Sequence, residues 1–370
     1  MDHQDYMKLA LQLAEGGKGQ TSPNPVVGAV VVNNGRIVGM GAHLKAGEPH
    51  AEVHALAMAG DKAKGATVYV TLEPCSHYGK TPPCADLLIE KGVAKVFVAT
   101  MDPNPQVSGR GIEMLKKAGV EVLTGLLKEQ ADALNEKFFH YMKTKTPFVT
   151  MKSAISLDGK IATATGESQW ITSEEARYDV HRYRDQNDAI LVGVNTVIAD
   201  NPKLTTRLSG GGKNPLRIIL DHHLRTPYEA NVVQDGEAET WIVAGRSVPE
   251  MQSSKYEQHG VKILTLSVEK IEILPLLKRL GSEGITSLFV EGGATVNDSF
   301  LRAGAAQEIV SYIAPKLIGG ESAPTSFAGI GFESLQDVPI FNFKSVDQIG
   351  EDLKIISRPK ERKEDVYRNY

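Results

Sequence analysis

The sequence predicts an α/β protein of two domains, residues 1–145 and 146–370. Three observations lead to this prediction. At 370 residues the chain is too long for one typical hydrophobic core. Short apolar, β-branched runs alternate with segments of helical apolar spacing, which is the pattern of helices packed on a sheet. The polar stretch 144–147 separates the last helix expected in the first half from the first strand expected in the second.

The first half is predicted to be a helix-flanked sheet of about five strands, a normal size for one domain. Helical spacing with flanking glycines or prolines predicts helices at 3–14, 51–59 and 109–118, one opening at Pro74-Cys75, and a long one at 126–141. Apolar β-branched runs predict strands at 26–32, 36–41, 67–72, 95–100 and 119–124. Asn33-Asn34-Gly35 is a hairpin signal between the first two strands.

The second half shows a similar alternation. Strands are expected at 148–155, 189–194, 216–221, 241–244, 262–266 and 287–290, with a loop at 201–207. The last of these strands runs directly into Glu291-Gly292-Gly293 and then into a helix expected at 296–303. Residues 358–365 are charged and have no periodicity, so we expect a solvated tail with no binding role.

His50-Ala51-Glu52 and the chain's two cysteines, Cys75 and Cys84, carry the clearest chemical signal. One imidazole and two thiolates suit Zn²⁺, and three protein ligands leave a fourth position for water, as in catalytic zinc sites. A chain so poor in cysteine is not held together by disulfides, so two nearby thiols are better explained as metal ligands than as buried structural thiols. We therefore predict one Zn²⁺ per chain on His50, Cys75 and Cys84.

Glu52 lies two residues after the predicted ligand His50. A glutamate that is not a ligand can exchange protons with a metal-activated water, which is the chemistry of zinc-dependent base deaminases. Their usual pattern, H-x-E followed by P-C-x-x-C, is matched only in its first half, because eight residues separate Cys75 from Cys84. Helix starts predicted at His50 and Cys75 would place two positive dipole ends at the metal and favour the thiolate of Cys75.

Three segments resemble the cytidine-deaminase superfamily: TSPNPVVGAV from Thr21, His50-Ala51-Glu52, and TLEPCSH from Thr71. The longer stretch PCSHYGKTPPC from Pro74, followed by Asp102-Pro103-Asn104-Pro105, resembles the bifunctional deaminase–reductase family of riboflavin biosynthesis. The eight-residue cysteine spacing is the rule in that family, and the resemblance covers nearly the whole chain. It implies a cytidine-deaminase-like three-layer domain at 1–145 and a dihydrofolate-reductase-like domain at 146–370.

The resemblance also implies a deaminase substrate pocket made of Asn24, His43, His77, Lys80, Asp102 and Asn104. Asn24 precedes a proline in a fixed turn, so its amide would be held rigidly enough to bind a pyrimidine edge. Lys80 and His77 lie on the loop between the cysteines, where a phosphorylated substrate needs cationic donors. The alternatives are that each is a solvated surface residue, and that Asp102 only caps the following turn.

The junction Glu291-Gly292-Gly293-Ala294-Thr295 has the form of a phosphate site. Glycines let the backbone approach an anion, and the first N–H groups of a helix receive it. The spacing is not G-x-G-x-x-G, so a Rossmann dinucleotide site is not predicted, and a tight turn without a ligand is an equal alternative on local sequence. The resemblance implies that this turn binds the NADPH phosphates, with cofactor contacts from Ala154, Trp170, Thr196, Asp200, Gly292, Gly293, Ala294 and Thr295.

The same resemblance implies a reductase substrate site lined by Ser168, Arg184, Leu204, Arg207 and Glu291. Arginines suit the substrate's phosphate because a guanidinium binds two phosphate oxygens at once. Lys152 and Glu291 are the candidates for proton transfer to a ribose opened to its C1 imine or aldehyde, with NADPH as the hydride donor. The alternative for Lys152 is a structural pairing with a carboxylate.

The implied function is two consecutive reactions on one phosphorylated pyrimidine nucleotide. Zinc-dependent hydrolysis removes the 2-amino group of 2,5-diamino-6-(5-phosphoribosylamino)pyrimidin-4(3H)-one, and NADPH-dependent reduction then converts the ribosyl group to ribityl. One alternative is a free cytidylate-type or guanine deaminase with an unrelated second domain, which the cysteine spacing disfavours. Another is a zinc-containing RNA-binding or RNA-editing module.

Charge and hydropathy restrict the possible partners. Lys and Arg nearly balance Asp and Glu in residues 1–145 and are outnumbered in the rest, so no nucleic-acid partner is expected. The longest apolar run, 26–32, is far too short to span a bilayer, and the first five residues lack the form of a signal peptide. We therefore expect a cytoplasmic enzyme without membrane contact. We also expect a homo-oligomer, a dimer or a tetramer, although charge and hydropathy do not specify this state.

Overall fold

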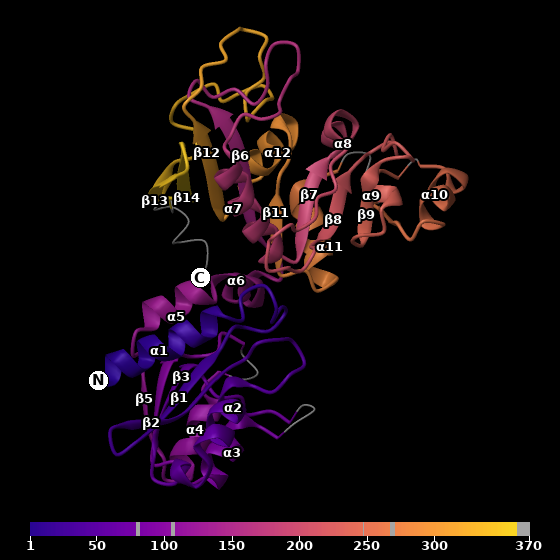
Figure 1. The fold of residues 1–370 in the computed structure, drawn as a ribbon. Coiled ribbons are helices and arrows are strands. Elements are labelled where there is room, and N and C mark those ends of the chain that lie inside the picture. Colours follow the sequence, from indigo (N-terminus) through magenta and orange to yellow (C-terminus); the bar gives the residue numbers. More distant parts are fainter. Residues whose placement is uncertain (79–81, 105–107, 247, 267–270, 361–370) are drawn as a thin grey trace. The chain divides into compact units, whose positions relative to one another are not determined.

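The computed structural model describes residues 1–360 except 79–81, 105–107, 247 and 267–270. The chain forms two compact units that divide between Lys145 and Thr146 (Figure 1). Each unit has its own sheet and its own hydrophobic core. Lys145 has a left-handed backbone conformation that ends the last helix of the first unit. Within the described residues, no helix is both long enough and apolar enough to cross a membrane.

The first unit is a five-stranded sheet with helices on both faces (Figure 1). The sheet order is β2-β1-β3-β4-β5, with β1 antiparallel to β2 and β3, and with β3, β4 and β5 parallel. Its strands are β1 (Gly28–Asn33), β2 (Arg36–Ala42), β3 (Thr67–Leu72), β4 (Lys95–Thr100) and β5 (Glu121–Thr124). Its helices are α1 (His3–Glu15), α2 (Ala51–Ala59), the short 3₁₀ helix η1 (Gly60–Ala63), α3 (Cys84–Glu90), α4 (Arg110–Lys117), α5 (Lys128–Leu134) and α6 (Glu136–Thr144).

Two separate apolar clusters hold the helices on this sheet. On one face Leu56 of α2, Leu88 of α3 and Leu115 of α4 pack with valines of the strands. On the other face Met7 of α1 and Ala131 of α5 pack with aromatic side chains of β3 and β4. All five side chains are almost fully excluded from water. The predicted α/β class and the three-layer form of this half are therefore confirmed.

The predicted helix opening at Pro74-Cys75 is wrong. Residues 73–78 are not helical, and α3 begins at Cys84. The pair Pro82-Pro83 explains this late start, because the residue before a proline is disfavoured in the helical region. Pro83 is extended (φ −59°, ψ 145°), and the Cys84 N–H then donates to Cys75 Sγ at 3.2 Å. A helix start does face Cys75, but it is the one at Cys84.

The single long helix predicted at 126–141 is also wrong, because the chain breaks at Asn135 (φ −109°, ψ 22°) into α5 and α6. The buried Asn135 amide bonds both backbone groups of Val26. Its Oδ1 accepts from the Val26 N–H and its Nδ2 donates to the Val26 carbonyl, each at 2.9 Å. These bonds hold the turn before β1 against the junction of α5 and α6, and no local pattern signals a partner so distant in sequence.

The second unit is a nine-stranded sheet in the order β10-β9-β8-β7-β11-β6-β12-β14-β13. The strands from β10 to β12 in this order are parallel, and β14 and β13 are antiparallel. The strands are β6 (Phe148–Ser156), β7 (Ala189–Gly193), β8 (Leu216–Leu220), β9 (Thr240–Ala244), β10 (Lys262–Thr265), β11 (Ser287–Val290), β12 (Glu308–Ala314), β13 (Phe341–Ile349) and β14 (Asp352–Pro359). The helices are α7 (Glu174–Asp185), α8 (Val194–Asp200), α9 (Asn231–Gln234), α10 (Glu250–Glu257), α11 (Ile273–Ser282) and α12 (Ala294–Arg302).

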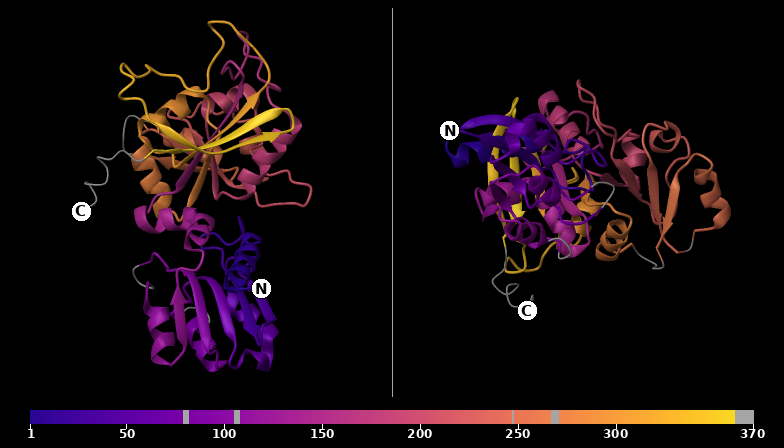
Figure 2. Two further views of the ribbon diagram at one scale, coloured as in Figure 1. Left: turned by 90° about the vertical axis from the view of Figure 1, so that its left-hand side faces the viewer. Right: turned by 90° about the horizontal axis from the view of Figure 1, so that it is seen from below.

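Neighbouring strands β7 and β11 send the chain to opposite faces of this sheet. Helix α8 follows β7 and packs with α7, α9 and α10, whereas α12 follows β11 and packs with α11. Open parallel sheets bind ligands beyond the carboxyl ends of strands at such a point. The yellow hairpin β13–β14, which faces the viewer in the left view of Figure 2, forms the edge of the sheet opposite β10. The sequence analysis did not predict it.

Two candidate active sites

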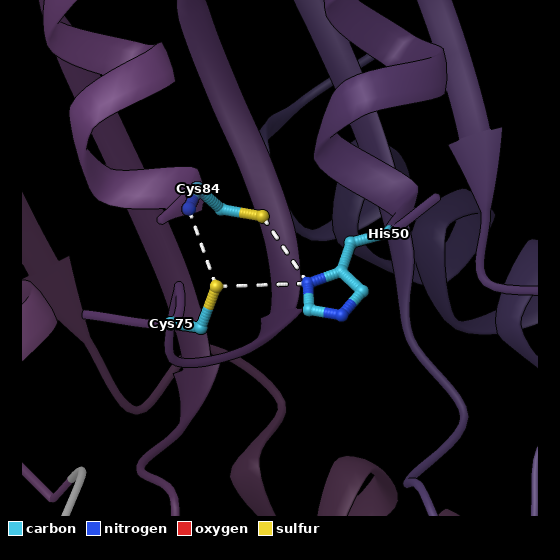
Figure 3. Close-up of side chains that lie close together, drawn as sticks. All are labelled: His50, Cys75 and Cys84. Atoms are coloured by element: carbon cyan, nitrogen blue, oxygen red, sulfur yellow. Dashed lines mark hydrogen bonds between the residues drawn. The ribbon is translucent and has the colours of Figure 1, made fainter. Parts of the chain in front are cut away.

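The first candidate site is formed by His50, Cys75 and Cys84 (Figure 3). His50 Nδ1 lies 3.6 Å from Cys75 Sγ and 3.3 Å from Cys84 Sγ, and all three atoms lie within 4.8 Å of one another. In a tetrahedral site with Zn–S about 2.3 Å and Zn–N about 2.0–2.1 Å, a sulfur and a nitrogen are about 3.6 Å apart. The three side chains therefore have the chemistry and the spacing to hold a Zn²⁺.

Packing explains how these three side chains meet. His50 is the N-cap of α2, and α2 lies so close to β2 that a Cβ on Gly41 would be 2.3 Å from the Ala51 carbonyl oxygen. Cys75 is the third residue after the end of β3, and Cys84 is the first residue of α3. The starts of α2 and α3 therefore converge on one point and favour negative charge there. Hydrogen bonds from Cys84 and from the His50 ring lower the pKa of the Cys75 thiol to about 4.

Glu52 is buried beside the metal ligands, with 3% of its surface exposed. Its carboxyl group hydrogen bonds with the Cys84 side chain. Burial, and then the negative charge of Cys75, raises the pKa of Glu52 to about 7. A carboxyl group with a pKa near neutrality can both accept and release a proton at physiological pH. This is the property that a proton shuttle between water and a leaving amine requires.

Asn24 and His43 lie next to this centre. The rings of His43 and His50 meet edge to face, with centroids 5.4 Å apart. His43 Nδ1 donates to the Pro49 carbonyl at 3.2 Å, which leaves Nε2 to accept from the Asn24 amide at 3.4 Å. Burial lowers the pKa of His43, so its ring is neutral. The structure thus joins two of the expected pocket residues to the metal ligands.

The other expected pocket residues are less closely connected. Asp102 is half-buried, and burial raises its pKa. Its Oδ1 accepts from the Asn104 N–H at 2.8 Å, so it does cap the following turn, as the alternative interpretation had it. His77 is exposed and lines an open surface pocket together with Arg110. Lys80 lies outside the described residues.

Glu73 is a structural organiser of this site that the sequence analysis missed. It is buried, and it accepts from the N–H groups of Gly109 at 3.0 Å and Gly111 at 3.1 Å. It thereby fixes the start of α4 and the segment after β4 at the end of β3. A glutamate between a buried strand and the Pro-Cys pair was the available signal, because a buried carboxylate needs donors.

The second candidate site lies where β6 and β11 run side by side in the second unit. Glu291 follows β11, and its two carboxylate oxygens accept from one edge of the Arg184 guanidinium, from Nε at 2.6 Å and from Nη2 at 3.0 Å. Lys152 Nζ of β6 lies 3.9 Å from the same carboxylate. The structure therefore brings together three of the predicted reductase residues.

Charge and burial oppose each other in this group. Burial favours a raised pKa for Glu291, but the positive charges of Arg184 and Lys152 outweigh it and lower the pKa. Burial lowers the pKa of Lys152, against the attraction of Glu291. Glu291 therefore stays ionised while the Lys152 ammonium releases its proton more readily than an exposed lysine.

Two glycines form the turn between β11 and α12, and packing explains only one of them. Gly292 is required by packing, because a Cβ there would lie 2.5 Å from Val296 Cγ1. Gly293 has φ −70° and needs no glycine conformation, and a Cβ there would lie 3.5 Å from Thr196 Oγ1, an ordinary contact. A tight turn can require a glycine with positive φ, but Gly293 does not have one. The buried Asn297 Oδ1 beside Gly292 accepts no hydrogen bond within the described residues.

The remaining predicted residues of the second site lie on several different elements. Ser168 hydrogen bonds with Asp200 at the end of α8. Trp170 is 61% exposed, with the Arg177 guanidinium 4.5 Å from the ring centroid. Leu204 is buried in the hydrophobic core, which leaves only its backbone for a substrate contact. Four predicted residues remain: Ala154 lies on β6, Ala294 and Thr295 open α12, and Arg207 is exposed on the loop before β8.

Two family models match the chain. The model described as the cytidine and deoxycytidylate deaminase zinc-binding region matches residues 1–100, and the model of the RibD C-terminal domain matches residues 147–355. The riboflavin biosynthesis protein RibD of Bacillus amyloliquefaciens is 54% identical over 98% of this chain and 99% of its own length. RibD of Escherichia coli is 45% identical over 95% of this chain and 98% of its own length. The match at 147–355 excludes an unrelated second domain.

Solved structures agree with these matches. A structure of Acinetobacter baumannii RibD is 40% identical, with a TM-score of 0.89 over 97% of this chain and 99% of that one. A Thermotoga maritima protein, described as a diaminohydroxyphosphoribosylaminopyrimidine deaminase and 5-amino-6-(5-phosphoribosylamino)uracil reductase, is 38% identical, with a TM-score of 0.87 over 96% of this chain and 98% of that one. With such identity over nearly its whole length, the chain belongs to the RibD family and is a bifunctional deaminase and reductase of riboflavin biosynthesis, with zinc and NADPH as its cofactors.

Proposed function

We propose that residues 1–145 deaminate and residues 146–370 reduce one phosphorylated pyrimidine nucleotide. The first substrate is 2,5-diamino-6-(5-phosphoribosylamino)pyrimidin-4(3H)-one, which loses its 2-amino group as ammonia. The ribosyl group of the product is then reduced to ribityl. The observation that carries this proposal is the cluster of His50, Cys75 and Cys84 with Glu52 buried beside it, in a chain whose second unit matches the RibD reductase domain.

In the deaminase site, zinc bound by His50, Cys75 and Cys84 supplies a Lewis acid that activates water. Glu52 takes a proton from that water and passes it to the leaving amino group, a role for which its burial and its raised pKa suit it. The neutral ring of His43 orients the Asn24 amide toward a pyrimidine edge. Asp102, Asn104, His77 and Lys80 complete the substrate pocket in this proposal.

In the reductase site, bound NADPH supplies the hydride for C1 of the opened ribose. The backbone at Gly292-Gly293, the start of α12 and Thr196 hold the cofactor phosphates. Lys152 gives its proton to the oxygen or nitrogen on C1, and burial makes that transfer easier. Glu291 holds both Lys152 and Arg184 in place. The other residues predicted for the reductase site contact the cofactor or the substrate, as the family resemblance implies.

The decisive experiment is anaerobic incubation of the full-length enzyme with the diaminopyrimidine ribotide, with and without NADPH, followed by product masses. Without NADPH we expect ammonia and a product in which oxygen replaces an amino group. With NADPH this product should gain two hydrogens. Glu52→Gln should stop the first step yet still reduce the deaminated nucleotide when it is supplied. Unchanged substrate under both conditions would refute the proposal.

We also propose a cytoplasmic homo-oligomer, a dimer or a tetramer, without nucleic-acid partners. The thiol ligands Cys75 and Cys84 suit a reducing compartment. Strand β13 is an edge of its sheet and exposes large apolar side chains, among them Phe343 at 73% and Val346 at 55%. A second copy that covers this edge would bury them. Sedimentation of the wild type and of Phe343→Glu tests this, since the variant should dissociate.

A further inference from the structure

His181 lies between the two arginines that were expected at the reductase substrate. It is on α7, three residues before Arg184, so the two side chains share one face of the helix. Its Nδ1 lies 3.2 Å from the Thr205 carbonyl oxygen, and its Nε2 lies 3.5 Å from Arg207 Nε. The sequence analysis gave no role to this residue.

These two contacts fix the protonation state of the ring. A carbonyl oxygen can only accept, so Nδ1 carries the proton that is donated to Thr205. Nε2 is then unprotonated and accepts from the Arg207 Nε–H. Burial, and then the positive charges of Arg184 and Arg207, lower the pKa of His181 to about 4, so the ring remains neutral at physiological pH.

The two arginines differ in what they have left for a ligand. Arg184 donates from Nε and Nη2 to Glu291 and from Nη1 to the Thr205 carbonyl, at 3.0 Å, so each of its three guanidinium nitrogens already donates inside the protein. The contact with His181 engages only Nε of Arg207, which is exposed. The two terminal amino groups of Arg207 can therefore grip phosphate oxygens together.

The Thr205 carbonyl connects His181 to Arg184. It accepts from His181 and from Arg184, and Thr205 is 2% exposed. Thr205, two residues before Arg207, thus binds the loop to α7. A long exposed side chain is costly to hold in one conformation, and a neutral imidazole on its Nε reduces that freedom before the substrate arrives.

We propose that His181 is a positioning residue of the reductase, whose ring holds the Arg207 guanidinium where it meets the substrate's phosphate group. The inference rests on the proposed function, because it takes Arg207 as a phosphate ligand. It predicts that His181 acts on the binding of phosphorylated substrate only, and through Arg207 only.

The test uses the full-length zinc-loaded enzyme and two reductase substrates, the deaminated ribotide and its dephosphorylated riboside. His181→Asn keeps a donor for the Thr205 carbonyl but loses the acceptor for Arg207. We expect its KM for the ribotide to rise about 10-fold, with kcat within about 2-fold of wild type and no change with the riboside. His181→Gln, which places an amide oxygen near the Nε2 position, should recover part of the loss. His259→Asn, an exposed histidine of the same unit, is the control.

Arg207→Ala tests the phosphate role of Arg207 separately from the positioning role of His181. It should raise the ribotide KM at least as much as His181→Asn, and adding His181→Asn to it should have no further effect. If Arg207→Ala leaves the ribotide KM unchanged, the phosphate role of Arg207 in the proposed function fails. If Arg207→Ala acts but both His181 variants match wild type, the positioning role is overturned. Equal losses on both substrates, or a lowered melting temperature that accounts for them, would also overturn it.

Discussion

Arg217 and Asp235 form a buried ion pair beneath the loop that carries Arg207. The Arg217 side chain is 1% exposed, and its Nη1 lies 2.8 Å and 3.0 Å from the two Asp235 oxygens. The same guanidinium donates to the Lys203 carbonyl at 3.2 Å, two residues before Thr205. This loop is therefore bound on two sides. Arg217 of β8 donates to it at Lys203, and His181 and Arg184 of α7 donate to it at Thr205.

The first prediction concerns this pair. Arg217→Met leaves the Asp235 carboxylate buried without its partner, so the second unit should lose about 3–5 kcal/mol of stability. Denaturant unfolding followed by the fluorescence of Trp241, which is in the same unit, measures this loss. Replacing both charges, in Arg217→Met/Asp235→Leu, should restore part of it, because no unpaired charge remains. A double variant weaker than Arg217→Met would contradict the explanation.

The second prediction concerns the metal. As-purified protein should contain about one zinc per chain, and His50→Ala should lose most of it because only two ligands remain. His54→Ala is a matched control, since His54 is an exposed histidine on the same helix. Elemental analysis of both variants and of Cys75→Ser measures the zinc content. Full stoichiometry in Cys75→Ser would remove Cys75 from the ligand set.

The third prediction separates metal binding from proton transfer. Glu52→Gln keeps the size of the side chain but cannot shuttle a proton, so ammonia release should fall by at least ~10². Zinc content should remain at the wild-type level, because Glu52 is not a ligand. Reduction of the deaminated nucleotide should not change, since its site is in the other unit. Near-normal ammonia release would exclude Glu52 as the shuttle.

The fourth prediction contrasts two adjacent glycines. Gly293→Ala fits the fold, because its Cβ would make an ordinary contact with Thr196. It should therefore keep the melting temperature but weaken NADPH binding by about 10-fold or more, as phosphate contacts are lost. Gly292→Ala should instead lower the melting temperature, since overpacking against Val296 costs about 1–3 kcal/mol of stability. Unaltered NADPH affinity in folded Gly293→Ala would argue against a phosphate site at this turn.

Much of the fold followed from local pattern. Strands β3 and β11 and helix α2 have the predicted bounds, because uninterrupted apolar runs or a clear helix start marked them. Strand β13 was not predicted, since it is largely exposed and the apolar alternation of Phe341 and Phe343 is broken by an irregularity before Ser345. The break at Asn135 depends on Val26 of another element, and a helix propensity scale contains no such term.

In the candidate sites, too, some residues could be predicted from the sequence and others only from the tertiary structure. His50, Cys75 and Cys84 were accessible to sequence reasoning because metal ligands leave a residue-type signature that does not depend on distant packing. The pairing of Arg184 with Glu291 joins helix α7 to the end of β11, and only tertiary structure shows that Arg184 is engaged there. His181 and Glu73 were missed because each acts through backbone or side-chain partners that lie far along the chain.

The bond between Asn135 and Val26 determines where this protein can be divided. The deaminase family match ends at residue 100, yet the turn that carries Asn24 is fastened to an amide 35 residues beyond it. A fragment trimmed to the matched region would retain every proposed zinc ligand and still release that turn. We therefore expect a self-sufficient deaminase fragment to extend at least to Asn135, within the compact unit that ends at Lys145. A fusion or transplant of this activity has to carry β5 and the three helices α4, α5 and α6, which lie beyond the matched region.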